Sequence, residues 1–520
     1  MKSLIDSTLV LALMGFFSCA NKPKEWSSAE PLYHELHRPQ FHFTPARHWM
    51  NDPNGLVYYE GEYHLFYQHY PDSNVWGPMH WGHAISKDLI HWEHLPIALY
   101  PDSLGLIFSG SAVIDYKNTS GFGSSDHPAM VAVFTYHSVE REKAGRKDVQ
   151  NQGIAFSVDK GRTWKKYEGN PNIKNIGKPD FRDPKVFWHS PSEQWVMVLA
   201  VKDHVELYGS KNLKNWNHLS DFGAKSGAHG GVWECPDLFE LNVTGSGEKK
   251  WVLFVSINPG AYNGGSGTQY FTGHFDGREF HPDPEEIRWI DYGKDNYAGV
   301  TWSNVPKEDG RRLFLGWMSN WQYANIVPTY TWRNAMTIPR ALSLVNTDRG
   351  LRLASHPVAE LRSLRKDNGV EYTDVLNATD TLTAEMDIPK TGSEIIIETE
   401  RRSEQKGFEI ELANSKGEKI RIGLQGESNQ FYIDRRYSGN IDFSTDFGGK
   451  HVGIRSSTGK DLKLTLLLDT SSLELFADDG TLVMTELCFP AENFNRLRIR
   501  SPKKGVKVKF VQVNSLKSIW

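Results

Sequence analysis

The chain has 520 residues, enough for two sizeable hydrophobic cores, because single cores stop growing near about 250–300 residues. Its formal net charge is −4, and basic and acidic residues are interspersed rather than gathered in blocks. With no basic stripe suited to a phosphate backbone, nucleic acid is not expected as a partner. Aromatic residues make up 12% of the chain, and they either fill β-sheet cores, the commoner case, or stack on sugar rings.

The first residues of the chain have the features of an export signal. Lys2 supplies a positive charge, an apolar run extends from Leu9 to Phe17, and a small residue, Ser18, precedes Cys19. The apolar run is too short to span a bilayer and is typical of a signal peptide. Cys19 resembles the cysteine that is lipidated in a bacterial lipobox. We therefore expect residues 1–19 to be a lipoprotein signal peptide, with Cys19 as the lipidation site.

The expected location follows from this signal. Residues 20–36 have linker composition and are predicted to tether the folded part to outer-membrane or other cell-envelope lipid, facing either the periplasm or the exterior. Phe16 stands where a lipobox usually carries leucine, so ordinary secretion without an anchor stays an alternative. Two further cysteines, Cys235 and Cys488, are expected in different domains and are not predicted to form a disulfide, despite the oxidising compartment.

The body of the chain has the pattern of an all-β protein. Helical periodicity is scarce, and short runs rich in β-branched and aromatic residues alternate with clusters of glycine, proline, asparagine and aspartate. In the first two thirds of the chain, strands are predicted at Leu56–Tyr59, Tyr63–Gln68, Met130–Tyr136, Lys185–Trp188, Trp195–Val201, Trp251–Ile257 and Leu313–Met318.

An internal near-repeat indicates how these strands are grouped. A strand end, a polar turn and an aromatic residue that begins the next strand recur every 50–70 residues or so. The copies begin at Ser86, Ser157 and Ser210, with a looser copy at Phe275. Such a unit is typical of propeller blades, although similar hairpin turns also arise independently. We predict a five-bladed β-propeller over residues 37–350.

The pattern changes after Pro357. No tryptophan occurs from there until Trp520, and a charged, helix-like stretch runs from Pro357 to Lys366. Alternating strands follow, which predict an antiparallel β-sandwich. Residues 351–368 are assigned to a linker and 369–520 to the sandwich. The predicted sandwich strands include Glu394–Glu400, Phe408–Leu412, Leu462–Leu468 and Leu473–Phe476.

Three carboxylate motifs, each expected at a turn beside a strand, are candidates for catalysis. Their central acids are Asp52, Asp183 and Glu234, in the strings WMNDPNG, FRDP and WECPD. Taken singly, the first is most simply a turn with a capping aspartate, and the second a local arginine–aspartate ion pair. Glu234 stands among apolar neighbours, where a glutamate is uncommon unless it is paired or functional.

Together the three motifs resemble those of glycoside hydrolase family 32, which contains the invertases, inulinases and levanases. The resemblance extends from about Arg38 to the C-terminus and implies a five-bladed propeller followed by a β-sandwich. It rests on the strings WMNDPNGL, FRDPKVFW and WECPDLFEL. Shorter matches are Phe66–Gln68, Trp76–Gly77, Phe108–Ser111, Asp291–Asp295 and Gly316–Met318.

The resemblance implies a role for each of the three acids. Asp52 would be the nucleophile, Glu234 the general acid/base and Asp183 a transition-state stabiliser. A retaining glycosidase needs two carboxyl groups about 5–5.5 Å apart, one ionised to attack and one protonated to donate. The expected substrate is a fructan (levan or inulin), sucrose, or both, cleaved at β-fructofuranosyl bonds. Exo-action is favoured because the family mostly acts in that way.

Further residues are assigned to substrate binding by the same resemblance. The side chains expected to contact or enclose fructose are Asn51, Gln68, Trp76, Phe108, Ser109, Arg182 and Trp317. The histidines, among them His64, His69, His80 and His83, lack tight ligand spacing and are interpreted as structural or rim residues. No metal or cofactor is expected, and the protein is expected to be a monomer.

Several alternatives stay open at the level of sequence. Related five-bladed enzymes hydrolyse arabinosides or xylosides with inversion, and a fructosyltransferase would pass fructose to sugar instead of water. Endo-action on levan or inulin is an alternative to exo-action, and no residue distinguishes β-2,1 from β-2,6 linkages. An alternative of another class is an inactive fructan-binding lipoprotein. The presence of all three acids in their expected motifs argues against it.

Overall fold

The computed structural model describes residues 32–520 apart from 285, 377–381, 402–406, 460 and 502–505. The expected signal peptide with Cys19, and residues 20–31 of the expected tether, lie outside these residues. Almost every regular element is a strand; the helical elements are α1 (Val139–Lys143) and the 3-10 helix η1 (Ala359–Leu364). In the described part of the chain, no helix is both long and apolar enough to cross a membrane.

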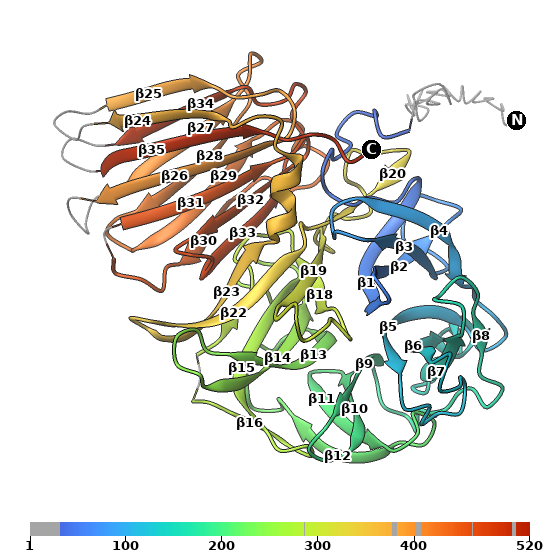
Figure 1. Ribbon diagram of the computed structural model, residues 1–520. Coiled ribbons are helices and arrows are strands. Elements are labelled where there is room, and N and C mark those ends of the chain that lie inside the picture. Colours follow the sequence, from blue (N-terminus) through green and yellow to red (C-terminus); the bar gives the residue numbers. More distant parts are fainter. Residues whose placement is uncertain (1–31, 285, 377–381, 402–406, 460, 502–505) are drawn as a thin grey trace, which may run out of the picture.

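Five antiparallel sheets form the first domain, and each is one blade (Figure 1). The first two blades contain β1 (His48–Tyr59), β2 (Glu62–Tyr70), β3 (His80–Ser86) and β4 (Trp92–Leu99), then β5 (Leu106–Asp115), β6 (Ala129–His137), β7 (Gln150–Ser157) and β8 (Lys165–Lys166). The third blade contains β9 (Phe181–His189), β10 (Gln194–Val201), β11 (His204–Ser210) and β12 (Asn217–Phe222).

The last two blades carry short additional strands. The fourth contains β13 (Val232–Asn242), β14 (Lys249–Asn258), β15 (Gly267–Phe275), β16 (Phe280–Pro282) and β17 (Arg288–Trp289). The fifth contains β18 (Tyr297–Thr301), β19 (Arg312–Met318), β21 (Ala335–Met336), β22 (Arg340–Thr347) and β23 (Gly350–Pro357). Because β23 continues the fifth blade, the propeller extends through the first part of the segment assigned to a linker.

The blades close into a ring around their first strands. β1 contacts β5, β5 contacts β9, β9 contacts β13, β13 contacts β18, and β18 returns to β1. A late segment, β20 (Trp332–Arg333), pairs in parallel with the start of β1 and adds a strand to the first blade. The predicted five-bladed propeller is confirmed, and its innermost strands surround a central axis.

The near-repeat corresponds to one position in the blades, the turn from the third to the fourth strand. In the second blade, the Ser157 hydroxyl donates to Asp159 Oδ1 at 2.7 Å, and Asp159 Oδ1 accepts from the amide of Thr163 at 2.9 Å. Ser86 with Asp88 and Ser210 with Asn212 make the same side-chain contact in the first and third blades. The sequence repeat therefore reports a repeated hairpin cap.

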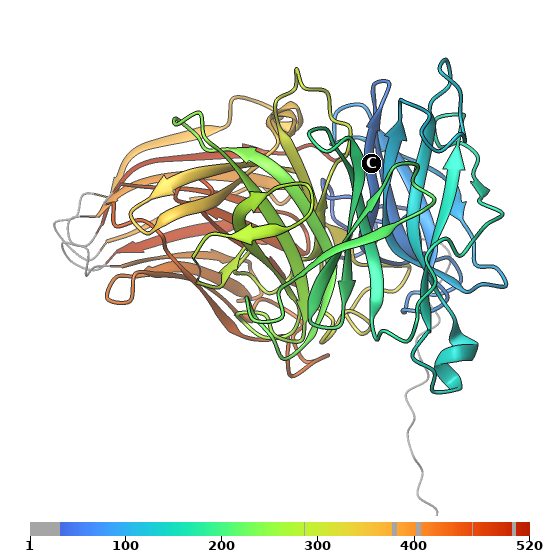
Figure 2. The same cartoon turned by 90° about the horizontal axis from the view of Figure 1, so that it is seen from below.

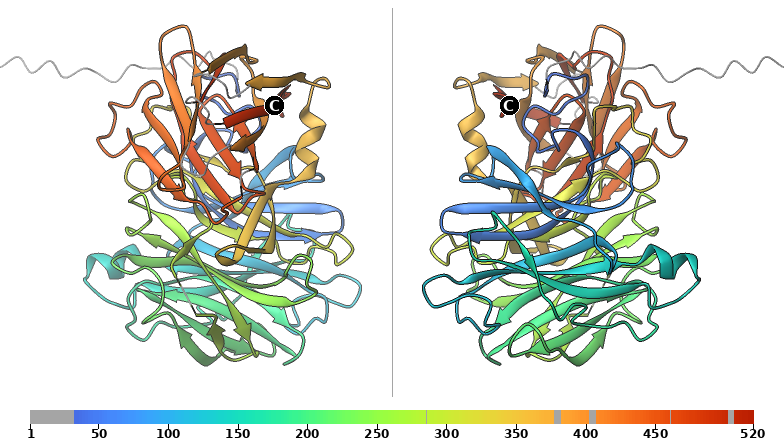
Figure 3. Two further views of the ribbon diagram at one scale, coloured as in Figure 1. Left: turned by 90° about the vertical axis from the view of Figure 1, so that its left-hand side faces the viewer. Right: turned by 90° about the vertical axis from the view of Figure 1, so that its right-hand side faces the viewer.

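Residues after η1 form a sandwich of two six-stranded sheets, as predicted (Figures 1 and 3). One sheet contains β24 (Val370–Leu376), β26 (Ser393–Arg401), β31 (Asp461–Leu468), β32 (Ser472–Ala477), β33 (Leu482–Leu487) and β35 (Val506–Ser515). The other contains β25 (Leu382–Asp387), β27 (Phe408–Ala413), β28 (Lys419–Gln425), β29 (Gln430–Tyr437), β30 (Lys450–Ile454) and β34 (Arg496–Ser501). Their inner faces share one aliphatic core.

The junction between propeller and sandwich contains fully buried charges. Arg340 of β22 bridges Asp291 of the propeller, at 3.0 Å, and Glu474 of the sandwich, at 2.7 Å. His42 contacts Glu474 at 3.0 Å and Asp469 at 2.8 Å through its two ring nitrogens. All five side chains have at most 1% of their surface exposed. Arg340 and His42 thus each pair with acids of the sandwich, which couples the two domains.

A second ion-pair group lies in the same junction. Arg435 of the sandwich contacts Asp295 of the propeller and also lies 2.9 Å from Glu486. The Asp291–Asp295 motif therefore serves the domain interface rather than the propeller axis.

Candidate active site

The three candidate acids lie on innermost strands, each at an irregularity of the strand pairing. The register shifts between Met50 and Pro53 beside Asp52, and between Glu234 and Asp237. A third shift lies in the β9–β10 ladder beside Asp183. A proline follows each acid within two residues, and because proline has no amide hydrogen, it interrupts the ladder. The acids thus belong to bulged strands rather than to the turns that the sequence suggested.

Asp52 accepts short hydrogen bonds from one residue of its own strand and one residue of the next blade. Ser109 Oγ donates to Asp52 Oδ2 at 2.6 Å, and Asn51 Nδ2 donates to Oδ1 at 3.0 Å. Burial raises the pKa of Asp52, and the negative charge of Glu234 adds to this effect, whereas the two donors lower it. Because both oxygens accept hydrogen bonds, the carboxylate has a fixed orientation.

Glu234 lies between a cation and a phenol. Arg182 donates from Nη2 to Glu234 Oε1 at 2.9 Å and from Nε at 3.2 Å. On the other side, the Tyr297 hydroxyl donates to Oε2. Burial, together with the charge of Glu234, raises the pKa of Tyr297 far above its usual value, so the phenol keeps its proton and stays a donor.

Asp183 shares its surroundings with Cys235. Asp183 has a left-handed backbone, with φ of 65°, and its Oδ2 accepts the amide hydrogen of Cys235 at 3.0 Å. Burial and the charges of Glu234 and Asp52 raise the pKa of Asp183 to about 7, against the opposing effect of Arg182. The thiol of Cys235 lies 3.5 Å from Asp52 Oδ2 and 3.6 Å from Asp183 Oδ2, and burial raises its pKa. It therefore stays a neutral thiol.

These side chains border one cavity of about 320 Å³, within the size range of small-molecule sites. All three acids line it, and so do the predicted residues Asn51, Gln68, Trp76, Phe108, Ser109 and Arg182. Trp317 does not: its side chain is fully buried behind the pocket. Trp321, with its ring centroid 4.9 Å from that of Trp317, lines the cavity instead. Trp317 was expected to wall the pocket, whereas in the structure it is Trp321 of the same segment that borders the cavity.

The rim of the pocket comes from the first and second blades. The ring of Phe108 stacks on His137 with centroids 4.3 Å apart, and Trp76 contacts Phe108 from the outer side, with 41% of its surface exposed. Glu142 of α1 also reaches the cavity and lies 3.2 Å from His137. α1 projects beyond the strands of its blade (Figure 2).

Several site residues were not predicted from the sequence. Trp321, Gln150 and Glu142 come from segments without a distinctive motif, whereas Asp180 directly precedes the FRDP string. Cys235 and Tyr297 could have been suspected, since one lies inside the WECPD string and the other two residues after the Asp291–Asp295 motif. Of the histidines interpreted as structural or rim residues, His64 and His83 are buried and lie 3.0 Å apart through their ring nitrogens.

One group in the described part of the chain has metal-ligand spacing, and it lies on the third blade, outside this cavity. Its members, His204, Glu206 and Asp221, offer atoms within 4.8 Å of one another. Lys178 Nζ already contacts both oxygens of Glu206, at 2.7 and 2.6 Å. The group is therefore an ion-pair cluster, and the catalytic cavity is built from carboxylates, amides and aromatic rings.

Comparison with known families agrees with this geometry. The model for the glycosyl hydrolases family 32 N-terminal domain matches residues 42–357, and the model for the family's C-terminal domain matches 360–517. This chain belongs to glycosyl hydrolase family 32. The family 32 domains coincide with the propeller and the sandwich.

Individual relatives of this family 32 protein align with nearly the whole of its chain. A levanase from Bacillus subtilis is 47% identical over 94% of this chain and 72% of its own length. The crystal structure of exo-inulinase from Aspergillus awamori superposes with a TM-score of 0.86 at 35% identity, covering 94% of this chain and 100% of its own. A variant of the fructofuranosidase from Schwanniomyces occidentalis, complexed with fructosylnystose, gives 0.85 at 35% identity, covering 94% and 99%.

Proposed function

We propose that this glycosidase hydrolyses β-fructofuranosyl bonds of fructans and sucrose with retention of configuration, through a covalent intermediate on Asp52. The observation that carries the proposal is the convergence of Asp52 and Glu234 on one small cavity, each in a different hydrogen-bonding environment. Asp52 receives two donors that favour its ionised form. Levanase, exo-inulinase and fructofuranosidase relatives support the substrate class.

The first step would form the fructosyl-enzyme. Asp52 attacks the anomeric carbon of the fructosyl ring while Glu234 passes its proton to the departing glycosidic oxygen. Arg182 and Tyr297 bind the two carboxyl oxygens of Glu234 and so orient this side chain toward the glycosidic oxygen. As the proton leaves, Glu234 gains negative charge, which the guanidinium of Arg182 stabilises.

The second step would release fructose. Glu234, now ionised, removes a proton from water, and the resulting nucleophile attacks the anomeric carbon and frees Asp52. Asp183 is proposed to bind sugar hydroxyls more strongly as the ring acquires positive charge. Asn51 and Gln68 offer amide contacts to the hydroxyls, and Trp76 and Trp321 enclose the ring.

Stereochemistry tests the central claim. Hydrolysis of sucrose in the presence of methanol should give the β-methyl fructofuranoside, which, unlike free fructose, does not mutarotate and is assigned by NMR. The α anomer would refute Asp52 as a nucleophile. Asp52→Asn should lower kcat by about three orders of magnitude or more while leaving fructan binding measurable. A wild-type protein that releases no fructose from sucrose, inulin or levan would instead be an inactive fructan-binding protein.

Exo-action is proposed from the small volume of the pocket. A cavity of about 320 Å³ closed by Trp76, the Phe108–His137 stack and Glu142 suits a chain end better than the middle of a polymer. Chromatography of early products from inulin and levan should show free fructose from the first time point. Oligosaccharides that appear before fructose would establish endo-action and refute this assignment.

The enzyme is further proposed to be exported and held in the cell envelope by lipid on Cys19. The signal-like sequence before Cys19 supports this, and the extracellular action of related exo-inulinases supports export. Labelled fatty acid should be incorporated into the wild-type chain and not into Cys19→Ser, and the variant should be released in soluble form. Equal fractionation of both proteins would favour ordinary secretion.

A further inference from the structure

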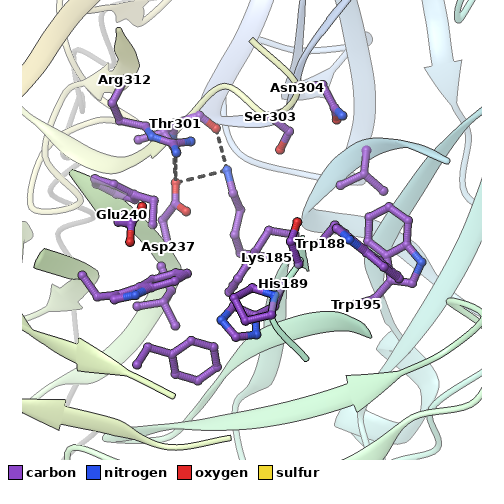
Figure 4. A pocket seen from close by; sticks show the side chains of 18 of the residues that line it. Lys185, Trp188, His189, Trp195, Asp237, Glu240, Thr301, Ser303, Asn304 and Arg312 are labelled. Carbon is purple, nitrogen blue, oxygen red and sulfur yellow. Dashed lines mark hydrogen bonds and ion pairs between the residues drawn. The ribbon is translucent and has the colours of Figure 1, made fainter. Parts of the chain in front are cut away.

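A second and larger cavity lies at the other end of the propeller axis. It measures about 880 Å³, against about 320 Å³ for the catalytic pocket, and it shares no lining residue with that pocket (Figure 4). Its walls come from the second, third, fourth and fifth blades. It is therefore a separate site built by the same ring of innermost strands.

The position of the second cavity follows from the direction of the innermost strands. β9 begins near the catalytic Asp183 and ends at His189 in the second cavity, and β13 runs in the same way from Glu234 to Glu240. Six residues of extended strand span about 20 Å. The second cavity thus opens on the face of the propeller opposite to the catalytic pocket.

A buried ion pair forms the inner end of this cavity. Lys185 Nζ lies 3.1 Å from Asp237 Oδ2 and donates to the carbonyl of Thr301 at 2.5 Å. Asp237 Oδ2 also accepts the amide of Thr301 at 2.6 Å (Figure 4). Lys185 and Asp237 are part of the FRDPK and WECPD strings, but they face the second cavity, and the catalytic mechanism does not use them.

Aromatic rings form much of the wall. Trp188 and Trp251 are partly exposed, and Tyr116 at the edge has 57% of its surface exposed. The ammonium group of Lys117 lies 4.7 Å from the centre of the Trp188 ring. Partly exposed indole rings present flat apolar faces, which suit the C–H faces of sugars.

The polar groups at this cavity include a cation without a partner. Within the described residues, the guanidinium of Arg312 makes no hydrogen bond or ion pair; it lies over the ring of Phe239, 5.1 Å from its centre. Burial lowers its pKa, against the attraction of Asp237 and Glu240. The partly exposed guanidinium therefore has N–H groups that are free to donate to a ligand. Glu240, exposed beside it, accepts from Lys249 through Oε2 at 2.6 Å and offers its other oxygen as an acceptor.

We propose that this second cavity binds a segment of fructan chain while the catalytic pocket of the same molecule holds a chain end. Arg312 donates to sugar hydroxyls, Glu240 accepts from them, and Trp188 packs against a ring face. A neutral polyol uses donors and acceptors together, and this cavity offers both beside its aromatic rings. The identity of the chain as fructan rests on the proposed function.

Affinity electrophoresis tests the binding itself. Full-length Asp52→Asn protein is run in native gels that contain inulin, levan or, as a reference, dextran. The catalytic pocket retards every variant equally, so the difference between variants reports the second cavity. Arg312→Ala and Trp188→Ala in the Asp52→Asn background should each raise the apparent Kd for fructan by about fivefold, and Arg278→Ala, an exposed arginine outside the cavity, should not.

Kinetics separate this proposal from loss of folding and from failure of the proposed function. With Asp52 intact, Arg312→Ala should hydrolyse sucrose like wild type, with a raised KM for polymeric fructan alone. Equal retardation of all variants, or retardation by dextran alone, would overturn the proposal. A variant that loses sucrose hydrolysis has lost its fold, and the milder Arg312→Gln then replaces it. A wild type inactive on sucrose, inulin and levan would refute the function, yet the gels would still report the binding.

Discussion

Asp52 is subject to opposing influences on its charge. Burial and the nearby carboxylate of Glu234 favour the protonated form, while the donors Ser109 and Asn51 favour the ionised form required for attack. The pH at which activity begins therefore depends on individual hydrogen bonds. Since Asp52 and Asp183 influence each other, the acid limb of kcat/KM reports both carboxylates together.

Removal of the Ser109 hydroxyl should move that limb. Ser109→Ala deletes a donor to the charged form of Asp52, so the pKa of Asp52 rises further. The acid limb of kcat/KM should shift to higher pH by about one unit, with activity lost first at low pH.

Ser111→Ala is the matched control, because Ser111 lies on the same strand but donates to the carbonyl of Pro184 at 2.8 Å. The acid limb of kcat/KM for Ser111→Ala should coincide with that of wild type. A limb that stays in place in Ser109→Ala, or moves to lower pH, would contradict the assigned role of this hydrogen bond.

The residues missed by the sequence analysis share a physical cause. Trp317 and Trp321 are four positions apart, and only the bend after β19 decides that one ring lies in the core and the other in the pocket. Tyr297 reaches Glu234 from another blade. Such contacts depend on the closure of the ring, which local patterns of hydrophobicity do not encode.

Among elements, the strands were predictable and their irregularities were not. Runs such as Trp195–Val201 and Trp251–Ile257 match β10 and β14, because buried strands are continuous apolar segments. The bulges beside Asp52, Asp183 and Glu234 were interpreted as turns, since asparagine, proline and glycine are common to both. The strands of the sandwich were predictable from the alternation of apolar and polar residues.

The repeated hairpin cap should contribute to stability and not to catalysis. Asp159 accepts from Ser157, from the amide of Thr163 and from the Thr163 hydroxyl, at 2.7, 2.9 and 2.6 Å. Asp159→Ala should lower the free energy of unfolding by about 1 kcal/mol, as measured by urea denaturation. Asp126→Ala, at an exposed loop position in the same blade, should change it little. A fall in kcat on sucrose would show that the cap affects the site.

In the whole molecule, the buried junction links stability to pH through His42. Burial alone would lower the pKa of His42, but hydrogen bonds to Asp469 and Glu474 raise it from 6.5 to about 9. A raised folded-state pKa stabilises the protein fully below about pH 6.5, and this contribution is lost as the pH rises through about 9. The contribution is on the order of 3 kcal/mol.

His42→Gln should therefore cost the most stability in mildly acidic solution. The difference in unfolding free energy between wild type and variant should be largest near pH 6 and should shrink toward pH 9.5, as followed by urea denaturation. His91→Gln, at an exposed pair with Asp88, should show a much smaller dependence. A difference that grows with pH would mean that His42 is neutral in the folded protein.

The pairing of β20 with β1 has a consequence for biosynthesis. The first blade receives its last strand only when Trp332 and Arg333 have left the ribosome, almost 300 residues after His48. Until then His48 and Trp49, at the start of the strand that carries Asp52, lack this partner strand. The first blade to begin is therefore completed only by a segment that follows the start of the fifth blade, so the ring closes late in the synthesis of the propeller.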